Sequence, residues 1–134
     1  MEYLFVYGTL MRTFGHPMHR VLKNYAEFMG EAKVRGRLYE IDGYPGLVVT
    51  DKASFVEGEL YRVHAPEPLF AELDRYEECS PEFPQPHEYL RLMREVFLKE
   101  GGTINAWVYC YNYPVDPAKL IASGRYTIRE AQKT

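Results

Sequence analysis

Much of the chain alternates between apolar and polar positions with a period of two, which is the pattern of strands that bury one face. The first strand is expected at residues 3–10, a run of aromatic and β-branched residues that favour strands. Further strands are expected at residues 31–41, 47–49, 55–63, 88–98 and 104–113. Glycines lie between and inside these segments, and Gly58 is expected at a bulge or a crossing point. Short strands of this kind predict a sheet that curls into a small barrel.

Two segments follow the helical period instead. Residues 19–25 place Val21, Leu22 and Tyr25 at helical spacing, which predicts one short helix. Residues 66–79 predict a longer helix, which opens with prolines suited to a first turn and has an apolar stripe formed by Leu69, Phe70, Leu73 and Tyr76. The expected fold class is therefore α+β: a small mixed or antiparallel β-barrel flanked by short helices, in one domain of residues 1–134.

The longer helix carries a carboxylate beside its apolar stripe. At about 100° per residue, Glu77 lies one turn beyond Leu73, whereas Asp74 and Glu78 point away from the stripe. A glutamate on the core side is unfavourable unless a partner satisfies it or a reaction uses it, because desolvation and the negative end of the helix dipole both raise its pKa. The pattern leaves two interpretations open: Glu77 is a functional acid, or it caps a neighbour at a frayed helix end.

The first predicted strand ends in Tyr7-Gly8-Thr9-Leu10, which is a candidate anion-binding turn. Gly8 permits backbone angles that are closed to other residues, so the amides of Gly8, Thr9 and Leu10 can point into one cleft. Converging amides favour a carboxylate or a phosphate, and the Thr9 hydroxyl can add a donor. An ordinary strand and turn has the same sequence, so the pattern does not separate these two interpretations.

Charge and residue usage narrow the possible partners. The formal net charge of -3 gives no general attraction to nucleic acid or to anionic membranes. Lys33, Arg35 and Arg37 form a basic stripe that we interpret as a solvated sheet face which discourages edge pairing. No apolar run is long enough to span a bilayer, and no signal peptide pattern follows Met1. We therefore expect no nucleic acid and no membrane as partners.

The cysteines and histidines give no sign of a metal or a disulfide. Cys79 and Cys110 fall in different predicted elements, which indicates reduced thiols in a cytoplasmic protein. His16 and His19 are the one close histidine pair, and no carboxylate lies beside them. The expectation is therefore a cytoplasmic protein that uses neither a metal nor a cofactor.

Taken together, these motifs give the chain a family likeness. It resembles the γ-glutamylcyclotransferase-like (AIG2-like) superfamily, especially its γ-glutamylamine cyclotransferase branch, over nearly its whole length. The matching fragments are Tyr7-Gly8-Thr9-Leu10, Pro45-Gly46-Leu47, Leu73-Asp74-Arg75-Tyr76-Glu77, Tyr89-Leu90-Arg91, Ala106-Trp107-Val108-Tyr109 and Ser123-Gly124. The chain departs from the family pattern at Glu78, where glycine is frequent, and at Arg125-Tyr126, which replaces an acidic-aromatic pair. The resemblance implies a barrel with a cavity at one mouth.

The resemblance also implies an activity. A γ-glutamylcyclotransferase-type enzyme closes the γ-glutamyl group of a small amide to 5-oxoproline, releases the amine and needs no cofactor. Glu77 would be the general acid/base, and the turn at Gly8 would hold the substrate α-carboxylate. The substrate-binding residues are expected to be Tyr7, Gly8, Thr9, Leu10, Pro45, Gly46, Tyr89 and Tyr113. The partner would be a small γ-glutamyl amino acid or γ-glutamylamine, and the chain would be a monomer or a weak homodimer.

This chemistry demands little of a protein. The α-amine and the γ-carbonyl belong to one molecule, and well-oriented intramolecular attack reaches effective molarities of roughly 10⁵ to 10⁸ M. The protein needs only to fold the substrate, remove an ammonium proton and return one to the leaving nitrogen, a task that favours a carboxyl pKa near neutrality. The alternative is a non-catalytic module of the same fold that binds a small metabolite or a partner protein, because fold does not fix function. A nucleic-acid-binding barrel is disfavoured by the acidic charge balance.

Overall fold

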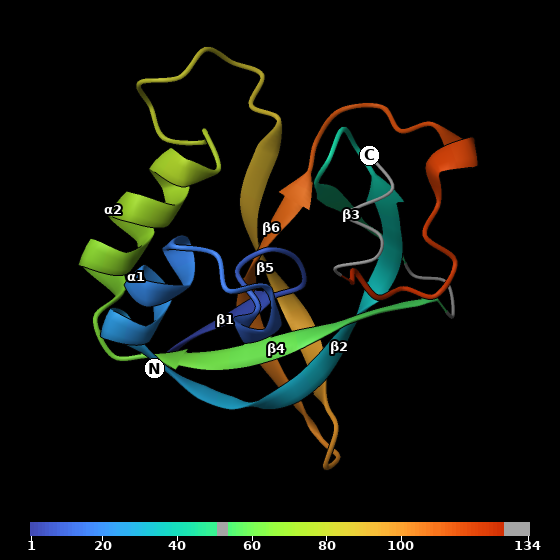
Figure 1. Ribbon diagram of the computed structural model, residues 1–134. Coiled ribbons are helices and arrows are strands. Elements are labelled where there is room, and N and C mark those ends of the chain that lie inside the picture. The colour runs from blue at the N-terminus through green and yellow to red at the C-terminus, as the bar shows by residue number, and fades with distance from the viewer. Residues whose placement is uncertain (51–53, 128–134) are drawn as a thin grey trace.

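The computed structural model describes residues 1–50 and 54–127 (Figure 1). Its strands are β1 (Glu2–Val6), β2 (Ala26–Glu40), β3 (Pro45–Val49), β4 (Phe55–Val63), β5 (Tyr89–Leu98) and β6 (Thr103–Tyr111). Its helices are α1 (Met18–Tyr25) and α2 (Pro66–Tyr76), with short 3-10 turns η1 (Arg12–Phe14) and η2 (Pro117–Lys119). None of the described helices is long and apolar enough to cross a lipid bilayer.

Five strands close into a barrel, which confirms the predicted α+β barrel. The sheet has the order β3-β2-β4-β1-β6-β5, and β2 also pairs with β5, so the ring runs β2-β4-β1-β6-β5. The pair β1–β6 is parallel and the other neighbours are antiparallel, which makes the barrel mixed. Closure depends on a short ladder that pairs Ala32 with Leu98, Lys33 with Phe97 and Val34 with Val96. Strand β3 extends the sheet beyond β2, outside the ring.

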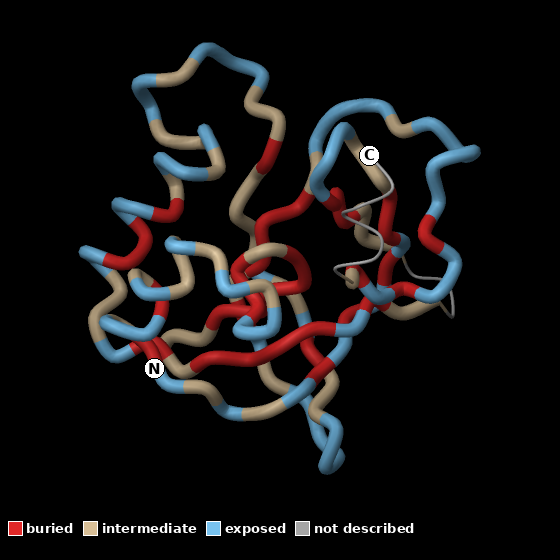
Figure 2. Tube along the Cα trace, in the orientation of Figure 1, coloured by how far each residue is buried: buried red, intermediate tan, exposed pale blue. Residues whose placement is uncertain are grey.

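The strands separate two hydrophobic cores because successive side chains point to opposite faces. In β1, Phe5 packs inside the barrel with Val34 and Val96, whereas Leu4 packs on the outer face with Leu22 of α1. The outer core also receives Leu69 and Leu73 of α2. The two helices lie side by side along one side of the barrel (Figure 1). Figure 2 shows the buried positions concentrated along the central strands, while most connecting loops are exposed.

Most predicted elements are present, but several ends differ. Strand β2 starts at Ala26, five residues before the predicted start at residue 31, because its first part pairs with β4 beyond a bulge between Phe28 and Gly30 that breaks the alternation. Gly58, predicted at a bulge or a crossing point, does not lie at this bulge, which is in the partner strand β2. It marks a close approach of β4 to β1, because a Cβ there would overlap the carbonyl oxygen of Val6.

Helix α2 ends at Tyr76, three residues before the predicted end at residue 79. The Glu77 N–H still donates to the Leu73 carbonyl at 2.8 Å, and Glu78 then adopts a left-handed conformation with φ 56°. Glycine is common at this position after a helix, because a Cβ disfavours left-handed angles. The chain turns there into the proline-rich loop that leads to β5, and this turn carries Glu77 and Glu78.

Candidate active site

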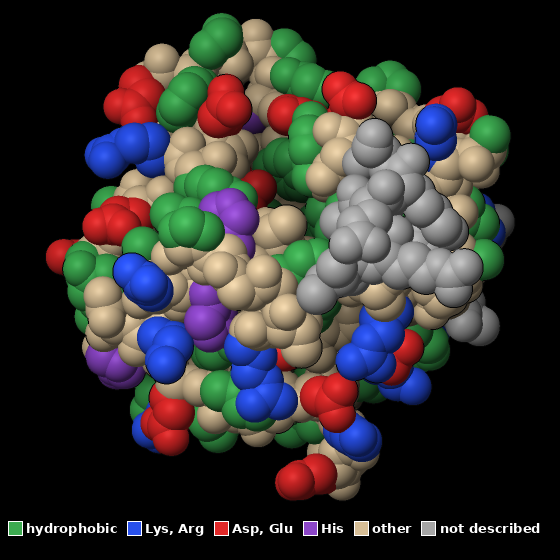
Figure 3. Space-filling model, in the orientation of Figure 1, with side chains coloured by type: hydrophobic (Ala, Val, Ile, Leu, Met, Phe, Trp, Pro, Cys, Tyr) green, Lys and Arg blue, Asp and Glu red, His purple; other side chains and the backbone are tan. Residues whose placement is uncertain are grey.

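A cavity of about 420 Å³ lies where the turn after β1, the turn before β3, the end of α2 and the start of β5 meet. Figure 3 shows this face of the molecule, with a hollow between the helical side on the left and the β3 side on the right. The structure brings seven of the predicted site residues together around the cavity: Tyr7, Gly8, Thr9, Leu10, Pro45, Glu77 and Tyr89. These residues are up to 82 positions apart in the sequence, so the barrel and α2 together create the site.

Two buried tyrosines fix the wall that β3 contributes. The Tyr7 hydroxyl donates to the carbonyl oxygen of Tyr109 and accepts from the Leu47 N–H at 3.3 Å. The Tyr89 hydroxyl donates to the Pro45 carbonyl at 2.7 Å. Burial raises the pKa of both phenols, so both stay neutral hydrogen-bond donors at ordinary pH. Their rings therefore shape the cavity, while their hydroxyls hold the backbone around it.

The turn after β1 presents backbone amides to the cavity. The Met11 N–H donates to the Gly8 carbonyl at 3.0 Å and closes the turn. Within residues 1–50 and 54–127, no acceptor receives a hydrogen bond from the N–H groups of Gly8, Thr9 or Leu10. The turn lies against the β3 wall, because a Cβ on Gly8 would be 2.7 Å from the Pro45 Cγ. Consecutive amides left without a protein acceptor are suited to an anionic oxygen group.

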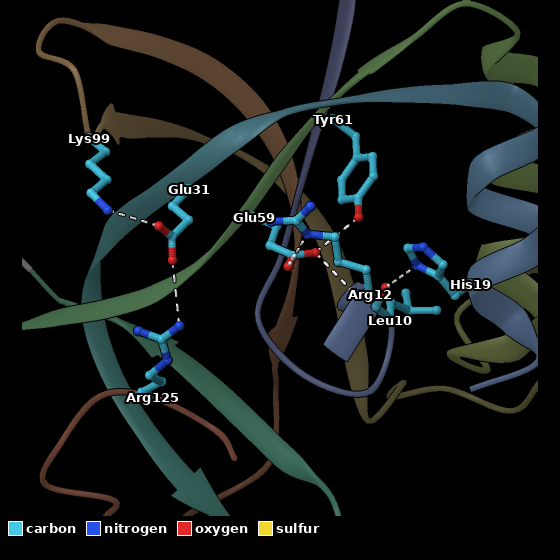
Figure 4. A network of polar contacts seen from close by, with 8 residues as sticks. All are labelled: Leu10, Arg12, His19, Glu31, Glu59, Tyr61, Lys99 and Arg125. Atoms are coloured by element: carbon cyan, nitrogen blue, oxygen red, sulfur yellow. Dashed lines mark hydrogen bonds and ion pairs between the residues drawn. The ribbon is translucent and has the colours of Figure 1, made fainter. Parts of the chain in front are cut away.

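Side chains from α1 and β4 hold the end of this turn in place (Figure 4). The His19 Nδ1 lies 2.9 Å from the Leu10 carbonyl oxygen. The Arg12 N–H donates to one oxygen of Glu59 at 3.1 Å, and its Nε lies 3.3 Å from the other. The Tyr61 hydroxyl donates to Glu59 at 2.9 Å, so this buried carboxylate is fully engaged. These contacts give the turn a defined position before any ligand binds.

Glu77 reaches the same cavity from the end of α2 and is half-buried. Burial raises its pKa to about 7, and the negative charges of Glu88 and Asp74 act in the same direction. Among the described residues, no side chain or backbone group donates a hydrogen bond to its carboxylate. A carboxyl group of this kind exchanges a proton near neutral pH, and its oxygens are available to a ligand.

The prediction that Asp74 points away from the packed side of α2 is wrong. Its carboxylate accepts two hydrogen bonds from Arg91, at 2.9 and 3.1 Å, and one from the Tyr109 hydroxyl at 2.6 Å. Helical periodicity identifies the apolar stripe of α2, but it gives no information on the strands that pack beside the stripe. Here β5 and β6 lie at the flank of the helix and supply the partners of Asp74. The Arg91 guanidinium also stacks on Phe70 and Trp107. This ion pair fixes the end of α2 next to the barrel and thereby positions Glu77.

Glu78 was predicted to point away from the apolar stripe; it is exposed, and it also lines the cavity. The predicted helix extended to residue 79, whereas the left-handed conformation of Glu78 follows the end of the helix at Tyr76. The second departure from the family pattern lies elsewhere: the Arg125 guanidinium is 3.5 Å from Glu31 and 3.7 Å from Glu57, outside this cavity.

Two predicted binding residues do not line the cavity. Gly46 is packed between Ile41 and Tyr111, where a Cβ would be 2.9 Å from either side chain. Tyr113 lies beyond the end of β6 and is 40% exposed; its hydroxyl donates to the Pro86 carbonyl at 2.8 Å. Its ring packs edge-on against that of Tyr111, with centroids 5.9 Å apart, beyond the end of β6 at Tyr111.

Sequence reasoning missed several lining residues, namely His16, Tyr44, Tyr76, Glu88 and Tyr109. The Tyr44 hydroxyl donates to Glu88 at 2.6 Å, and the Tyr76 hydroxyl lies 3.4 Å from His16 Nε2 and 3.5 Å from the Thr9 hydroxyl. His16, Tyr44 and Glu88 lie in loops, where periodicity carries no information. Tyr76 and Tyr109 belong to fragments that match the family pattern, which was the available signal for these two. Within the described part of the chain, no group of three or more metal-ligating side chains is found.

Several known proteins are similar to this chain in sequence. The family model described as gamma-glutamyl cyclotransferase, AIG2-like, matches residues 4–128. A putative gamma-glutamylcyclotransferase of Methanocaldococcus jannaschii is 31% identical over 128 residues, which cover 94% of this chain and 96% of that protein. A gamma-glutamylaminecyclotransferase of Mus musculus is 30% identical over 125 residues, covering 84% of this chain and 77% of that protein.

Solved structures extend the similarity to three dimensions. The crystal structure of an AIG2-like protein from Mus musculus superposes with a TM-score of 0.70 at 28% identity and covers 95% of this chain and 88% of that one. A structure named gamma-glutamyl cyclotransferase superposes with a TM-score of 0.60 at 15% identity, which shows the shared fold, and covers 83% of this chain and 66% of that one. The chain therefore belongs to the AIG2-like γ-glutamyl cyclotransferase family.

Proposed function

We propose that this protein converts a small γ-glutamyl amide to 5-oxoproline and a free amine, with Glu77 as the general acid/base. The substrate α-nitrogen attacks its own γ-carbonyl carbon, the new C–N bond closes a five-membered ring, and the bond to the departing nitrogen breaks. The α-ammonium nitrogen loses two protons on the way to the lactam N–H. A single group takes up one of them and delivers it to the departing nitrogen, and the other passes to the released amine, which leaves as an ammonium ion, or to solvent.

The amides of Gly8, Thr9 and Leu10 are assigned to the substrate α-carboxylate. They lack acceptors among the described residues, and the Thr9 hydroxyl lies beside them as a further donor. The Tyr7 and Tyr89 rings form the wall against which the glutamyl chain folds. Holding the carboxylate at one end leaves the α-nitrogen and the γ-carbonyl close together, which supplies most of the rate advantage of an intramolecular reaction.

Glu77 is assigned to the proton transfers. Its ionised form accepts the ammonium proton, and its protonated form then donates to the departing nitrogen. A pKa of about 7 suits both directions, since each form is well populated near neutral pH. The observation that carries the proposal is this pairing in one cavity: a carboxyl group without a hydrogen-bond donor, and a turn of amides without acceptors.

The test compares Glu77→Gln with the wild type on a panel of γ-glutamyl amides, with 5-oxoproline as the measured product. We expect kcat to fall by at least about 100-fold while the Kd for the same amides changes by less than about twofold, because glutamine keeps the shape but carries no proton. Glu72→Gln, an exposed carboxylate on the same helix, is the matched control and should match the wild type.

A Glu77→Gln variant that releases 5-oxoproline at near the wild-type rate would reject the assignment of Glu77. Saturable binding of the amides by the wild type without any product would reject the enzymatic proposal, and it would support a binding module on the same fold.

A further inference from the structure

Three polar side chains on the cavity wall form a chain of contacts that ends at the turn after β1. The His16 Nε2 lies 3.4 Å from the Tyr76 hydroxyl, and that hydroxyl lies 3.5 Å from the Thr9 hydroxyl. All three residues line the cavity. They come from the loop before α1, the end of α2 and the turn after β1. The inference that follows rests on the proposed function, because it concerns how Thr9 meets the substrate α-carboxylate.

The first member of this chain is held by the start of α1. The His16 carbonyl accepts the His19 N–H at 2.9 Å, and the His16 Nδ1 accepts the Met18 N–H at 3.1 Å. A backbone N–H can only donate, so Nδ1 carries no hydrogen in this contact. A neutral imidazole has one ring N–H, which is therefore on Nε2, the nitrogen that faces Tyr76. The backbone at the start of α1 thus selects the tautomer of His16.

The tautomer fixes the direction of the other two contacts. The Nε2–H of His16 donates to the Tyr76 oxygen, which leaves the Tyr76 hydrogen for the Thr9 oxygen. Thr9 accepts from Tyr76, so its own hydrogen remains available to a ligand in the cavity. In the opposite direction, Thr9 would donate to Tyr76 and would present only lone pairs, which repel a carboxylate. The chain therefore makes Thr9 a donor toward the cavity.

Ring packing keeps the members of the chain in place. The rings of His16 and Tyr76 lie edge-on, with centroids 5.5 Å apart. Tyr76 is the last residue of α2 and directly precedes Glu77, so the same contact connects the carboxylate turn with the helix end that carries the proposed acid/base. A donor that is oriented before the ligand arrives binds it better than one that must first rotate.

We infer that His16 and Tyr76 are positioning residues, which hold the Thr9 hydroxyl as a hydrogen-bond donor for the substrate α-carboxylate. Their effect on binding passes through Thr9 and not through contacts of their own with the carboxylate. Separations of 3.4 and 3.5 Å are long for hydrogen bonds, and contacts of this kind shorten when the ligand that they serve is bound.

A double-variant cycle tests the action through Thr9. The measured quantities are kcat and KM for γ-glutamyl-n-propylamine, with 5-oxoproline as the product. Thr9→Val keeps the shape and removes the hydroxyl, and it should raise KM by about 10-fold. Tyr76→Phe should raise KM by about threefold with a smaller effect on kcat, because the Thr9 hydroxyl then has no fixed direction. In the Thr9→Val background, Tyr76→Phe should have no further effect on KM.

His16→Asn separates the chain of contacts from the start of α1. The asparagine side chain accepts the Met18 N–H in place of Nδ1, but it is too short to reach Tyr76. We expect KM to rise by about threefold, the urea midpoint of unfolding to stay that of the wild type, and the effect on KM to vanish in the Thr9→Val background. Thr13→Val, at an exposed position outside the cavity, is the matched control and should leave KM unchanged.

The possible results separate this inference from the proposed function. If Tyr76→Phe changes nothing, or raises KM by the same factor with and without the Thr9 hydroxyl, the inference is overturned and the proposed function stands. A His16→Asn variant with the KM of the wild type would also overturn it. No 5-oxoproline from the wild type would overturn both.

Discussion

At the scale of single residues, the function proposed for Glu77 and the stability of the fold make opposite demands on its carboxyl group. A carboxyl whose pKa rises from 4.5 to about 7 on folding binds its proton more tightly in the folded chain than in the unfolded one. Its contribution to stability is therefore fully present below about pH 4.5 and is lost as the pH rises through about 7. The folded protein at neutral pH retains an acid that a more stable sequence would replace.

The first prediction follows from this linkage. At about pH 8 the free energy of unfolding of Glu77→Gln should exceed that of the wild type by about 1 to 3 kcal/mol, because the wild type must bury an ionised carboxylate. The gap should close at about pH 3.5, well below the unfolded-state pKa of 4.5, where the carboxyl is protonated in both the folded and the unfolded state. Urea unfolding of both proteins at the two pH values measures it. An equal gap at both pH values would contradict the raised pKa.

The second prediction concerns Gly8. A Cβ there would approach the Pro45 Cγ to 2.7 Å, and the Pro45 backbone is held by the Tyr89 hydroxyl, so Gly8→Ala should displace the turn that is assigned to the α-carboxylate. We expect KM to rise by about 10-fold with a smaller effect on kcat. The double variant Gly8→Ala/Pro45→Ala removes the atom that the new methyl group meets and should recover part of the affinity. A double variant no better than Gly8→Ala would show that the contact is not the cause.

At the scale of elements, the strands and helices were largely readable from the sequence, whereas their ends and flanks were not. Alternation located β4 at residues 55–63 and β5 within one residue of its start, because their burial follows the period of two. The start of β2 was missed because Gly30, with a positive φ, breaks the alternation next to a bulge. The end of α2 was missed because Glu78 is a helix former in the left-handed position that usually holds glycine.

The third prediction tests how α2 is held. Asp74→Asn weakens the contact with Arg91 and Tyr109, so the protein should lose about 1 to 3 kcal/mol of stability, because it leaves a half-buried guanidinium without its counter-ion. The acidic limb of the kcat/KM profile should also move to lower pH, because the negative charge of Asp74 helps to raise the pKa of Glu77. Urea unfolding and a pH–rate profile measure the two effects.

A matched control is the exposed ion pair between Arg75, near the end of the same helix, and Glu82 in the loop that follows it. Glu82→Gln breaks the exposed ion pair of Arg75, whose nitrogen lies 3.3 Å from the Glu82 carboxylate, and should change stability by less than about 0.5 kcal/mol without moving the pH profile. If Asp74→Asn and Glu82→Gln had the same small effects, the contact between Asp74 and Arg91 would not position the end of α2.

At the scale of the whole molecule, the barrel is closed by one short ladder. The β2–β5 pairing includes Val34 opposite Val96, both almost fully buried, and joins the two ends of the ring. Glu31 reinforces this region from the surface through Lys99 and Arg125, at 2.9 and 3.5 Å (Figure 4). The sequence predicted a barrel, but it did not predict which two strands close the ring. Alternation shows which side chains share a face of a strand, and it does not show which strands pair.

The fourth prediction tests this closure. Val96→Ala removes buried methyl groups from the ladder and should destabilise the protein by about 2 kcal/mol. Val96 does not line the cavity, so kcat/KM at a temperature where the variant is folded should stay within about twofold of the wild type. The neighbouring exposed change Glu95→Gln should be neutral in both measurements. A loss below about 0.5 kcal/mol for Val96→Ala would show that the closing ladder contributes little to the stability of the barrel.

Site residues could be predicted where they belong to a local motif with reactive or ligand-binding side chains. They could not be predicted where only the fold brings distant residues together. Glycine, hydroxyl and carboxylate chemistry made Tyr7-Gly8-Thr9-Leu10 and Glu77 candidates, the family resemblance decided between the open interpretations, and the structure places these residues around one cavity. Tyr44 and Glu88, 44 residues apart, meet through a hydrogen bond that no local pattern predicts. Tyr113 was included with the resemblance and does not line the cavity; it lies two residues beyond the end of β6.

The distribution of the cavity wall along the chain has a consequence for synthesis in the cell. The wall takes residues from six separate stretches, the first around Tyr7 and the last at Tyr109. A nascent chain on the ribosome therefore holds no complete site until β6 has emerged and paired with β1 and β5. The first product formed during translation would therefore show that the barrel is complete. Measurements of turnover can then give the time at which the barrel folds.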